Sequence, residues 1–345
     1  MATILPHTPP ASPGVGMRRR GPKELPKLPL SAFSPPNTGT SDAFPLAPSP
    51  STVHPEHIVD AHVILTKDNS LESWKSQAGD VLGGRSGGVV LLANGDQSEV
   101  KAIAEGLEST NVLSVAIPFD LDAPDGASQY GSLQTKAQKS LHSVVKSLSP
   151  DSNTGLKWAL QQGCPVDLDV QTPMAESSIE SFQELIISAS DNLQNSGPII
   201  LSNVLPPPHD LTLPIVKLLN DPMYRSFQAF TASLSLYPRI FVKFTPPSWD
   251  APTPSTSASA DLDDKQKREW KRRIKMFLGP VIEAFGVQRI IFGSSPSPAA
   301  TGSSTASDWY EIARESLAEL GVEQEDIDAV FFENAKRVYA AAPSV

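Results

Sequence analysis

Residues 287–296 read VQRIIFGSSP, and this stretch decides the fold. Its apolar run is short, contains β-branched residues and stops at Gly293, as expected for a buried parallel strand whose C-terminal end faces a site. An amphipathic helix is predicted before it, over residues 263–284, and Pro280 is expected to bend or break that helix. A second helix is predicted over residues 308–320. The repeating unit is therefore a strand, a site loop and a helix.

The same alternation continues upstream and downstream of this stretch. Because an α/β barrel commonly uses about 250 residues as one domain, the pattern and the chain length of 345 residues predict an α/β fold with one (β/α)8 TIM-like barrel over residues 58–342. Strands are predicted at 58–64, 88–93, 112–119, 165–170, 198–203 and 237–244, and helices at 97–107, 136–148, 155–162, 178–193, 211–219, 224–236 and 325–340.

Two segments differ from the barrel in composition. Residues 1–57 are dominated by Pro, Ser and Thr without apolar periodicity, so we predict a disordered tail. Lys23 to Pro29 matches the basic-x-x-P-x-x-P pattern of SH3 ligands, a pattern that also arises by chance in such a tail. A low-complexity insertion at 246–261 is either a flexible flap over the site or merely tolerated length.

Charge and cysteine content narrow the classes of partner and compartment. The formal net charge of −10 disfavours a nucleic-acid partner, because such binding needs a concentrated basic face. A single cysteine, Cys164, cannot form an internal disulfide, and no apolar segment is long enough to span a membrane. We therefore expect a cytoplasmic protein. Arg18 to Arg20 hint at a mitochondrial presequence, but the many prolines of the tail would break the helix that import needs.

Three motifs resemble those of one enzyme family. The stretches are Asp60-Ala61-His62 in the first predicted strand, Lys243 in the strand at 237–244, and the closing segment 331–339, FFENAKRVY. Together with the Gly-Ser-Ser-Pro after the last strand, they resemble the amidohydrolase superfamily, in its branch of small decarboxylases and sugar or dicarboxylate lactonases. The resemblance covers roughly residues 58 to 342.

The resemblance implies a metal-binding barrel, in which the first strand supplies two histidines, later strands two more, and an aspartate follows the last strand. Here His62 stands at the first position, but Ile64 stands at the second. Asp169 or a neighbour, Asn203 and Ser295 stand where the later histidines and the aspartate belong, so one imidazole remains. Because Ile, Asn and Ser replace such ligands poorly, we expect neither a tight metal nor another cofactor, and no general base at Ser295.

Each remaining group also has a purely structural interpretation. His62 either donates to a backbone carbonyl or takes part in the pocket. Asp60 needs a partner, because an unpaired buried carboxylate is costly. Lys243, in an apolar strand, is expected to line the pocket with a substrate carboxylate or Asp169 as its partner. The candidate catalytic residues are thus His62, Asp60 and Lys243, and the candidate substrate-binding residues are Asp169, Asn203 and Ser295.

Three functions remain open. The loss of most ligands favours a pseudoenzyme, a barrel that binds a small acidic metabolite or a protein partner without turnover. The alternative is a metal-independent hydrolase of the lactonase type, since strained lactones need less electrophilic help than amides. The third is an adaptor that acts through its proline-rich tail, with the barrel as a scaffold.

Overall fold

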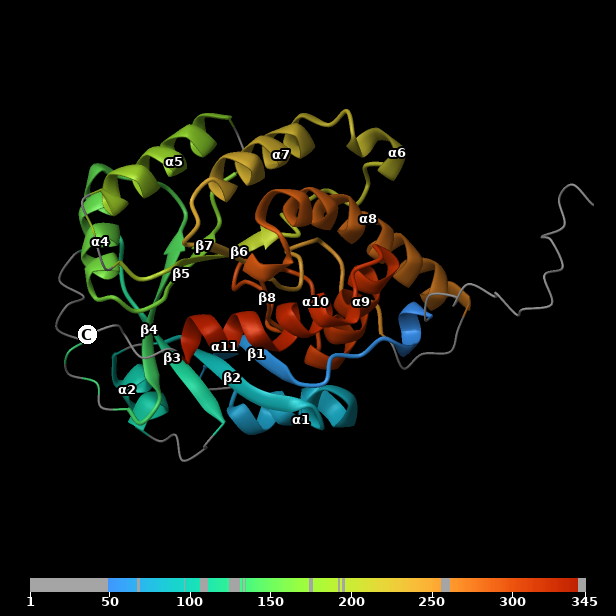
Figure 1. Ribbon diagram of the computed structural model, residues 1–345, viewed down its shortest axis with the longest axis horizontal. Coiled ribbons are helices and arrows are strands. Elements are labelled where there is room, and N and C mark those ends of the chain that lie inside the picture. The colour runs from blue at the N-terminus through green and yellow to red at the C-terminus, as the bar shows by residue number, and fades with distance from the viewer. Residues whose placement is uncertain are drawn as a thin grey trace, which may run out of the picture. The chain divides into compact units, whose positions relative to one another are not determined.

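The computed structural model describes residues 49–340 apart from 67–68, 96, 106–110, 124–130, 132, 134, 174–175, 192, 194–195 and 256–260. Eight parallel strands form one sheet in chain order and curl into a nearly closed barrel (Figure 1). The predicted α/β barrel is therefore confirmed. The strands are β1 (Ile58–Leu65), β2 (Ser86–Ala93), β3 (Val112–Pro118), β4 (Gln138–Val145), β5 (Val166–Val170), β6 (Ile199–Leu205), β7 (Ile240–Phe244) and β8 (Ile290–Phe292).

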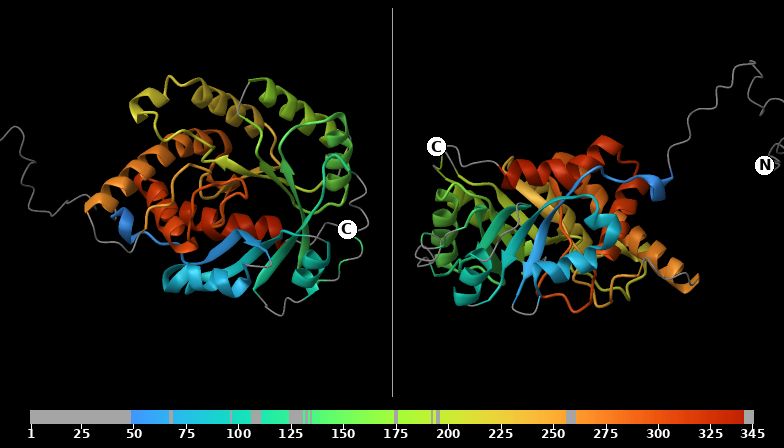
Figure 2. Two further views of the ribbon diagram at one scale, coloured as in Figure 1. Left: turned by 180° about the vertical axis from the view of Figure 1, so that it is seen from behind. Right: turned by 90° about the horizontal axis from the view of Figure 1, so that it is seen from below.

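Helices follow most of the strands and, apart from α11 (Asn334–Tyr339), cover the outside of the barrel (Figures 1 and 2). Short 3-10 turns lie at Pro50–Thr52 and Val287–Arg289, and a π-helical turn, Ala329–Glu333, joins the last two helices. The helices are α1 (Leu71–Gly83), α2 (Gln97–Glu105), α4 (Pro150–Gln161), α5 (Glu176–Ser190), α6 (Ile215–Leu218), α7 (Pro222–Ser235), α8 (Asp261–Phe285), α9 (Ala306–Glu319), α10 (Gln324–Asp328) and α11 (Asn334–Tyr339).

The segment after β8 links the two ends of the sheet. The backbone N–H of Ser295 donates to the carbonyl oxygen of His62 over 2.9 Å, and the N–H of Ile64 donates to Ser295 Oγ over 3.1 Å. Gly293 permits this close approach, because a Cβ at that position would lie 2.4 Å from the Cβ of His62. Ser295, predicted as a substrate-binding residue, thus helps to hold β1 beside the end of β8.

Two apolar cores follow from the alternation of side chains along the strands. The larger core fills the space between the sheet and the surrounding helices and includes Trp74, Trp309 and Phe331. The smaller core combines inward-facing strand residues such as Val59 and Ile200 with residues of α11. Helix α11 therefore plugs part of the barrel interior, and its last residue, Tyr339, reaches the polar centre described below.

The structure differs from the sequence prediction most at residues 136–148, which were expected to be helical. They form β4, whose Leu141 and Val145 are buried on the helix side while Ser140 and His142 face the barrel interior. Polar residues interrupt the apolar pattern of this strand because it borders the polar centre. Because this strand was not predicted, His142 was not recognised as a candidate site residue.

Smaller differences concern element boundaries. Helix α8 is not broken at Pro280, and residues 211–219 contain only the short helix α6. Residues 287–289 form a 3-10 turn before β8 instead of the start of the strand. Helix α1 was not predicted. No helix in the described ranges is long and apolar enough to cross a membrane.

The first part of the 246–261 insertion packs against the barrel. Trp249 is completely buried, its Nε1 donates to the carbonyl oxygen of Pro207 over 3.0 Å, and its ring lies 4.8 Å from that of Trp270. Residues 246–255 are therefore anchored. The predicted disordered tail, the SH3-type segment Lys23 to Pro29 and the basic stretch Arg18 to Arg20 lie outside the described residues.

Candidate functional site

A buried ion pair occupies the centre of the barrel. Lys243 of β7 places Nζ 2.7 Å from Oδ1 of Asp167 of β5, and both side chains are 0% exposed. The hydroxyl of Tyr339 donates to the same Asp167 oxygen over 2.7 Å, and Lys243 Nζ lies 5.4 Å from the centre of the Tyr339 ring. Burial lowers the pKa of Lys243, an effect that the nearby aspartates oppose. The carboxylate partner is thus Asp167 and not Asp169, and Lys243 does not line the pocket described below.

His62 contacts this pair from β1. Its Nδ1 lies 3.3 Å from Lys243 Nζ. Burial, followed by repulsion from the Lys243 ammonium, holds the pKa of His62 well below its usual value, so the imidazole is neutral. A register shift between Asp60 and Val63 accommodates an extra residue and lets His62 point inward although Asp60, two residues earlier, does not.

Asp60 lies on the side of β1 that faces helix α1. It accepts hydrogen bonds from Trp74 Nε1 over 2.8 Å, from the backbone N–H of Ser294 over 2.8 Å and from the Ser294 hydroxyl. The N–H of His62 adds a fourth donor at 3.2 Å. Burial raises the pKa of Asp60, and these hydrogen bonds limit the increase. Asp60 therefore has the hydrogen-bond partners that a buried carboxylate needs, and these bonds join β1 to α1 and to the loop after β8.

His142 is the site residue that the sequence reasoning missed. It pairs in register with Asp167 across β4 and β5 and is nearly buried. Burial lowers its pKa, while the charges of Asp167 and Asp169 oppose that shift. The site therefore contains two imidazoles, His62 and His142, and the expectation of a single one was wrong.

Three polar atoms of the barrel centre have no hydrogen-bond partner among the described residues. They are Nδ1 of His142, Oδ2 of Asp167 and Oδ1 of Asp169, and all three are buried. The other oxygen of Asp169 accepts from Ser297 Oγ over 2.8 Å and from Gln171 Nε2 over 2.9 Å. Asp169, predicted as a substrate-binding residue, thus lies in the barrel centre, and one of its two oxygens has no partner within the described part of the chain.

Asn203 has a different environment from the other predicted site residues. Its backbone adopts a positive φ of 61°, its Nδ2 donates to the carbonyl oxygen of Val170 over 2.9 Å, and its Oδ1 accepts from Ser248 Oγ over 2.7 Å. These bonds tie the end of β6 to β5 and to the 246–255 segment. Both functional groups of its side chain amide are therefore engaged within the protein.

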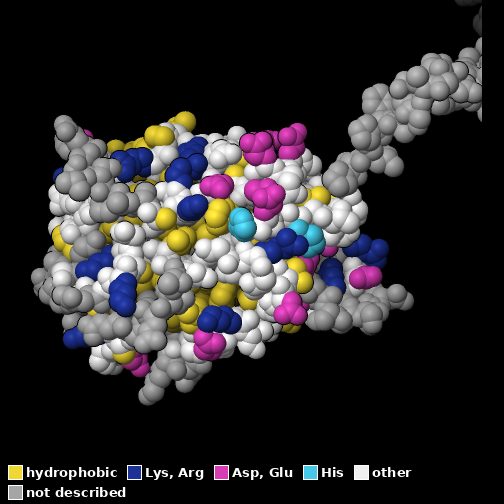
Figure 3. Space-filling view, turned by 60° about the horizontal axis from the view of Figure 1, so that its bottom comes forward, with side chains coloured by type: hydrophobic (Ala, Val, Ile, Leu, Met, Phe, Trp, Pro, Cys, Tyr) yellow, Lys and Arg dark blue, Asp and Glu magenta, His cyan; other side chains and the backbone are white. Residues whose placement is uncertain are grey.

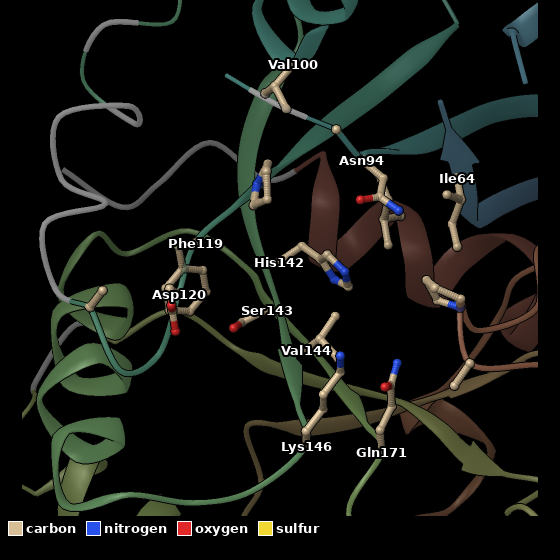
Figure 4. Close-up of a pocket in the computed structure, with 16 residues that line it drawn as sticks. Ile64, Asn94, Val100, Phe119, Asp120, His142, Ser143, Val144, Lys146 and Gln171 are labelled. Atoms are coloured by element: carbon tan, nitrogen blue, oxygen red, sulfur yellow. The ribbon is translucent and has the colours of Figure 1, made fainter. Parts of the chain in front are cut away.

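A pocket opens beside the centre, at the C-terminal ends of β1 to β5. Its volume is about 880 Å³. Figure 4 shows the side chains of His142, Lys146 and Gln171 extending into one common space, with Asp120 at another side of it. Ile64, Leu92, Val100, Phe119 and Val144 supply apolar walls. His142 and Gln171 connect this pocket to Asp167 and Asp169, so the pocket and the buried centre form one candidate site.

The donor set of the centre does not fit a tightly bound metal ion. Within the described ranges, no three His, Cys, Asp or Glu side chains are placed so that they could hold one. The ammonium of Lys243 lies against both His62 and Asp167, and a positive charge there repels a second cation.

Comparison with known proteins gives a likeness of fold. No protein-family model matches the chain, and no curated protein sequence matches it. A crystal structure of an amidohydrolase from Burkholderia multivorans with bound zinc has a TM-score of 0.59 at 14% identity, over 83% of this chain and 100% of that one. A probable 2-pyrone-4,6-dicarboxylic acid hydrolase from Acinetobacter baumannii with citric acid bound has a TM-score of 0.52 at 10% identity, over 83% and 100%.

A third structure, a putative 2-pyrone-4,6-dicarboxylic acid hydrolase from Pseudomonas putida, has a TM-score of 0.51 at 12% identity, over 82% of this chain and 97% of that one. The three structures agree in architecture with the eight-stranded barrel described here. The protein therefore has the fold of the amidohydrolase structures along its barrel.

Proposed function

We propose that the protein binds a small acidic molecule in the pocket beside its buried centre, without a tightly bound metal and without turnover. The observation that carries this proposal is Lys146, which extends into the pocket next to the Gln171 amide (Figure 4) and makes no ion pair within the described part of the chain. An ammonium and an amide N–H at one place are suited to a carboxylate.

The size and walls of the pocket support the same ligand class. A volume of about 880 Å³ lies within the range of roughly 300–1,000 Å³ that is common for small-molecule sites. Citric acid, a small polycarboxylate, is bound in the similar structure from Acinetobacter baumannii. Lys243 was the lysine expected to hold the ligand, but its bond to Asp167 leaves Lys146 as the better candidate.

Thermal unfolding in the presence of mono-, di- and tricarboxylates tests the proposal, because a bound ligand stabilises the folded state by mass action. Lys146→Met should weaken binding of the best carboxylate about 10- to 100-fold, the worth of a charge-assisted hydrogen bond. Lys217→Met, on the exposed side of α6, removes the same charge away from the pocket and should bind as the wild type does. If no carboxylate raises the melting temperature, or if Lys146→Met binds normally, the proposal fails.

A metal-independent lactonase is a second candidate, and His142 favours it. The imidazole of His142 lines the pocket, and the nearby charges of Asp167 and Asp169 favour its protonated form, as a general base requires. In this reaction, His142 takes a proton from water as the water oxygen attacks the lactone carbonyl. The C–O bond of the lactone ring then breaks, and His142 passes the proton to the leaving oxygen to give a hydroxy acid.

A screen of lactones separates the two candidates. If the protein hydrolyses a lactone, and if His142→Gln abolishes this activity while the fold and carboxylate binding stay intact, the protein is a lactonase and the proposal of binding without turnover is wrong. Absence of turnover together with carboxylate binding through Lys146 supports the binder.

A further inference from the structure

The pocket beside the barrel centre carries two opposite charges at separate places. Among the described residues that line it, Lys146 follows β4 directly and Asp120 lies two residues after β3. Figure 4 shows these two side chains at different sides of the pocket. Neither forms an ion pair within the described part of the chain, so they do not neutralise each other. The pocket therefore offers one cation and one anion to a ligand.

The carboxylate of Asp120 is held in place by the loop after β3. The backbone N–H of Asp122 donates to Asp120 Oδ1 over 2.9 Å. The side chain of Asp122 in turn accepts from the hydroxyls of Ser149 and Ser152 at the start of α4, each over 2.6 Å. These bonds fix the loop to α4. Oδ2 of Asp120 has no hydrogen-bond partner in the described ranges, so it is available to a donor of the ligand.

The buried groups behind the pocket favour a positive charge in it as well. Burial lowers the pKa of His142, which lines the pocket, while the charges of Asp167 and Asp169 raise it. The single ammonium of Lys243 offsets these two carboxylates only in part. A second carboxylate of a ligand would therefore be repelled by Asp120 and by the buried aspartates, whereas a cationic group would be attracted.

We propose that the ligand of this pocket is a small amino acid-like molecule, whose carboxylate binds to Lys146 and Gln171 and whose ammonium group binds to Asp120. Both contacts are charge-assisted hydrogen bonds, and the three donors of an ammonium suit a carboxylate oxygen. Phe119 and Val144, two of the apolar wall residues, contact the methylene groups between the charged ends. Because both ends are recognised, the pocket discriminates against monocarboxylates and dicarboxylates.

This inference rests on the proposed binding of a carboxylate at Lys146, and it goes beyond that proposal by naming the group at the other end of the ligand. The carboxylate end alone does not distinguish among small acids. The ammonium end does, because Asp120 is the fully charged acid among the described lining residues.

The test compares acids of equal chain length by isothermal titration calorimetry with the full-length wild-type protein. The probes are β-alanine, γ-aminobutyric acid, δ-aminovaleric acid and ε-aminocaproic acid, each set against the straight-chain monocarboxylate and dicarboxylate of the same length. The best amino acid should bind at least about five-fold more tightly than its monocarboxylate, because the ammonium adds a charge-assisted hydrogen bond. The dicarboxylate should bind more weakly than the amino acid, since its second carboxylate meets Asp120.

Three variants assign this preference to a residue. Asp120→Asn keeps an oxygen that can accept from Asp122 but removes the charge, so the preference for the amino acid should fall to less than about two-fold. Lys146→Met should weaken the amino acid and the monocarboxylate by the same factor. Asp210→Asn is the matched control, because the exposed Asp210 accepts from the N–H of Thr212 over 2.8 Å in a similar turn outside the pocket. Its preference should equal that of the wild type.

The outcomes separate this inference from the proposed function. If none of these acids binds, the proposed carboxylate site is wrong and the inference falls with it. If monocarboxylates bind through Lys146 as tightly as the amino acids of equal length, only the inference is wrong. The wild-type protein alone gives this answer, so it does not depend on the folding of a variant. A preference for amino acids that persists in a folded Asp120→Asn would also overturn the inference.

Discussion

The Nζ atom of Lys243 lies 2.7 Å from Oδ1 of Asp167, with both side chains completely buried. Two charges in such a place are stable only because each compensates the other. The pair connects β5 and β7 across the barrel interior, and Tyr339 connects it to the last helix. The stability of the barrel should therefore depend on both partners together.

A double-mutant cycle on this pair should show strong coupling. Lys243→Met or Asp167→Leu alone should each destabilise the protein by about 3–5 kcal/mol, because one buried charge is left without its partner. The double variant should lose much less than the sum of the two, as measured by urea unfolding. The exposed pair Lys75–Glu72 is the control, and its coupling should be below about 1 kcal/mol. Additive losses at Lys243 and Asp167 would show that the pair is not an energetic unit.

Gly293→Ala tests the contact between β1 and the end of β8. The new methyl group would lie 2.4 Å from the Cβ of His62, so the backbone of one strand must move. We expect a loss of roughly 1–3 kcal/mol in the free energy of unfolding, as for overpacked cores. Gly83→Ala in α1 is the control, since the nearest side-chain atom to the added group is the Cβ of Ala78 at 4.0 Å, and it should be neutral or stabilising by up to about 1 kcal/mol. Equal effects at the two glycines would contradict the close approach.

The buried histidines predict a pH dependence of stability. The pKa values of His62 and His142 are lowered from 6.5 in the folded protein, so the unfolded chain binds more protons below that pH. Their contribution is fully present above 6.5 and is lost as the pH falls from there toward the folded pKa values. His54 and His209 act in the same direction.

Unfolding free energies measured between about pH 7 and 5 check this expectation. The wild type should lose stability toward the acid side. His62→Gln and His142→Gln should each have a shallower slope, and the double variant the shallowest. A slope that is unchanged in both single variants would show that these imidazoles are not held neutral by burial.

Strands that contain a short apolar run, such as residues 199–201 in β6 and 290–292 in β8, could be recognised from the sequence because burial on both faces demands such runs. Strand β4 could not, because its inward residues serve a polar centre and its segment QKSLHSVV has a weak pattern. The number of predicted strands nevertheless indicated that one strand was missing. The sequence prediction placed seven strands in a barrel that needs eight, with a long gap between residues 119 and 165.

The site was predictable in part for a similar reason. Strand alternation indicated correctly that Lys243 points inward, but the identity of its partner depends on which strands face each other across the barrel. The inward turn of His62 depends on a register shift after Asp60, and local sequence does not specify such a shift. Long-range geometry therefore decides which polar residues meet.

The metal content of the purified wild-type protein tests the central claim most directly. Because Lys243 pairs with Asp167 in the barrel centre and no three His, Cys, Asp or Glu side chains of the described ranges are placed to hold a metal ion, elemental analysis after dialysis should find well under one equivalent of zinc, manganese or iron per chain. One equivalent of any of these metals that survives dialysis and disappears in His62→Ala or Asp167→Ala would contradict the account.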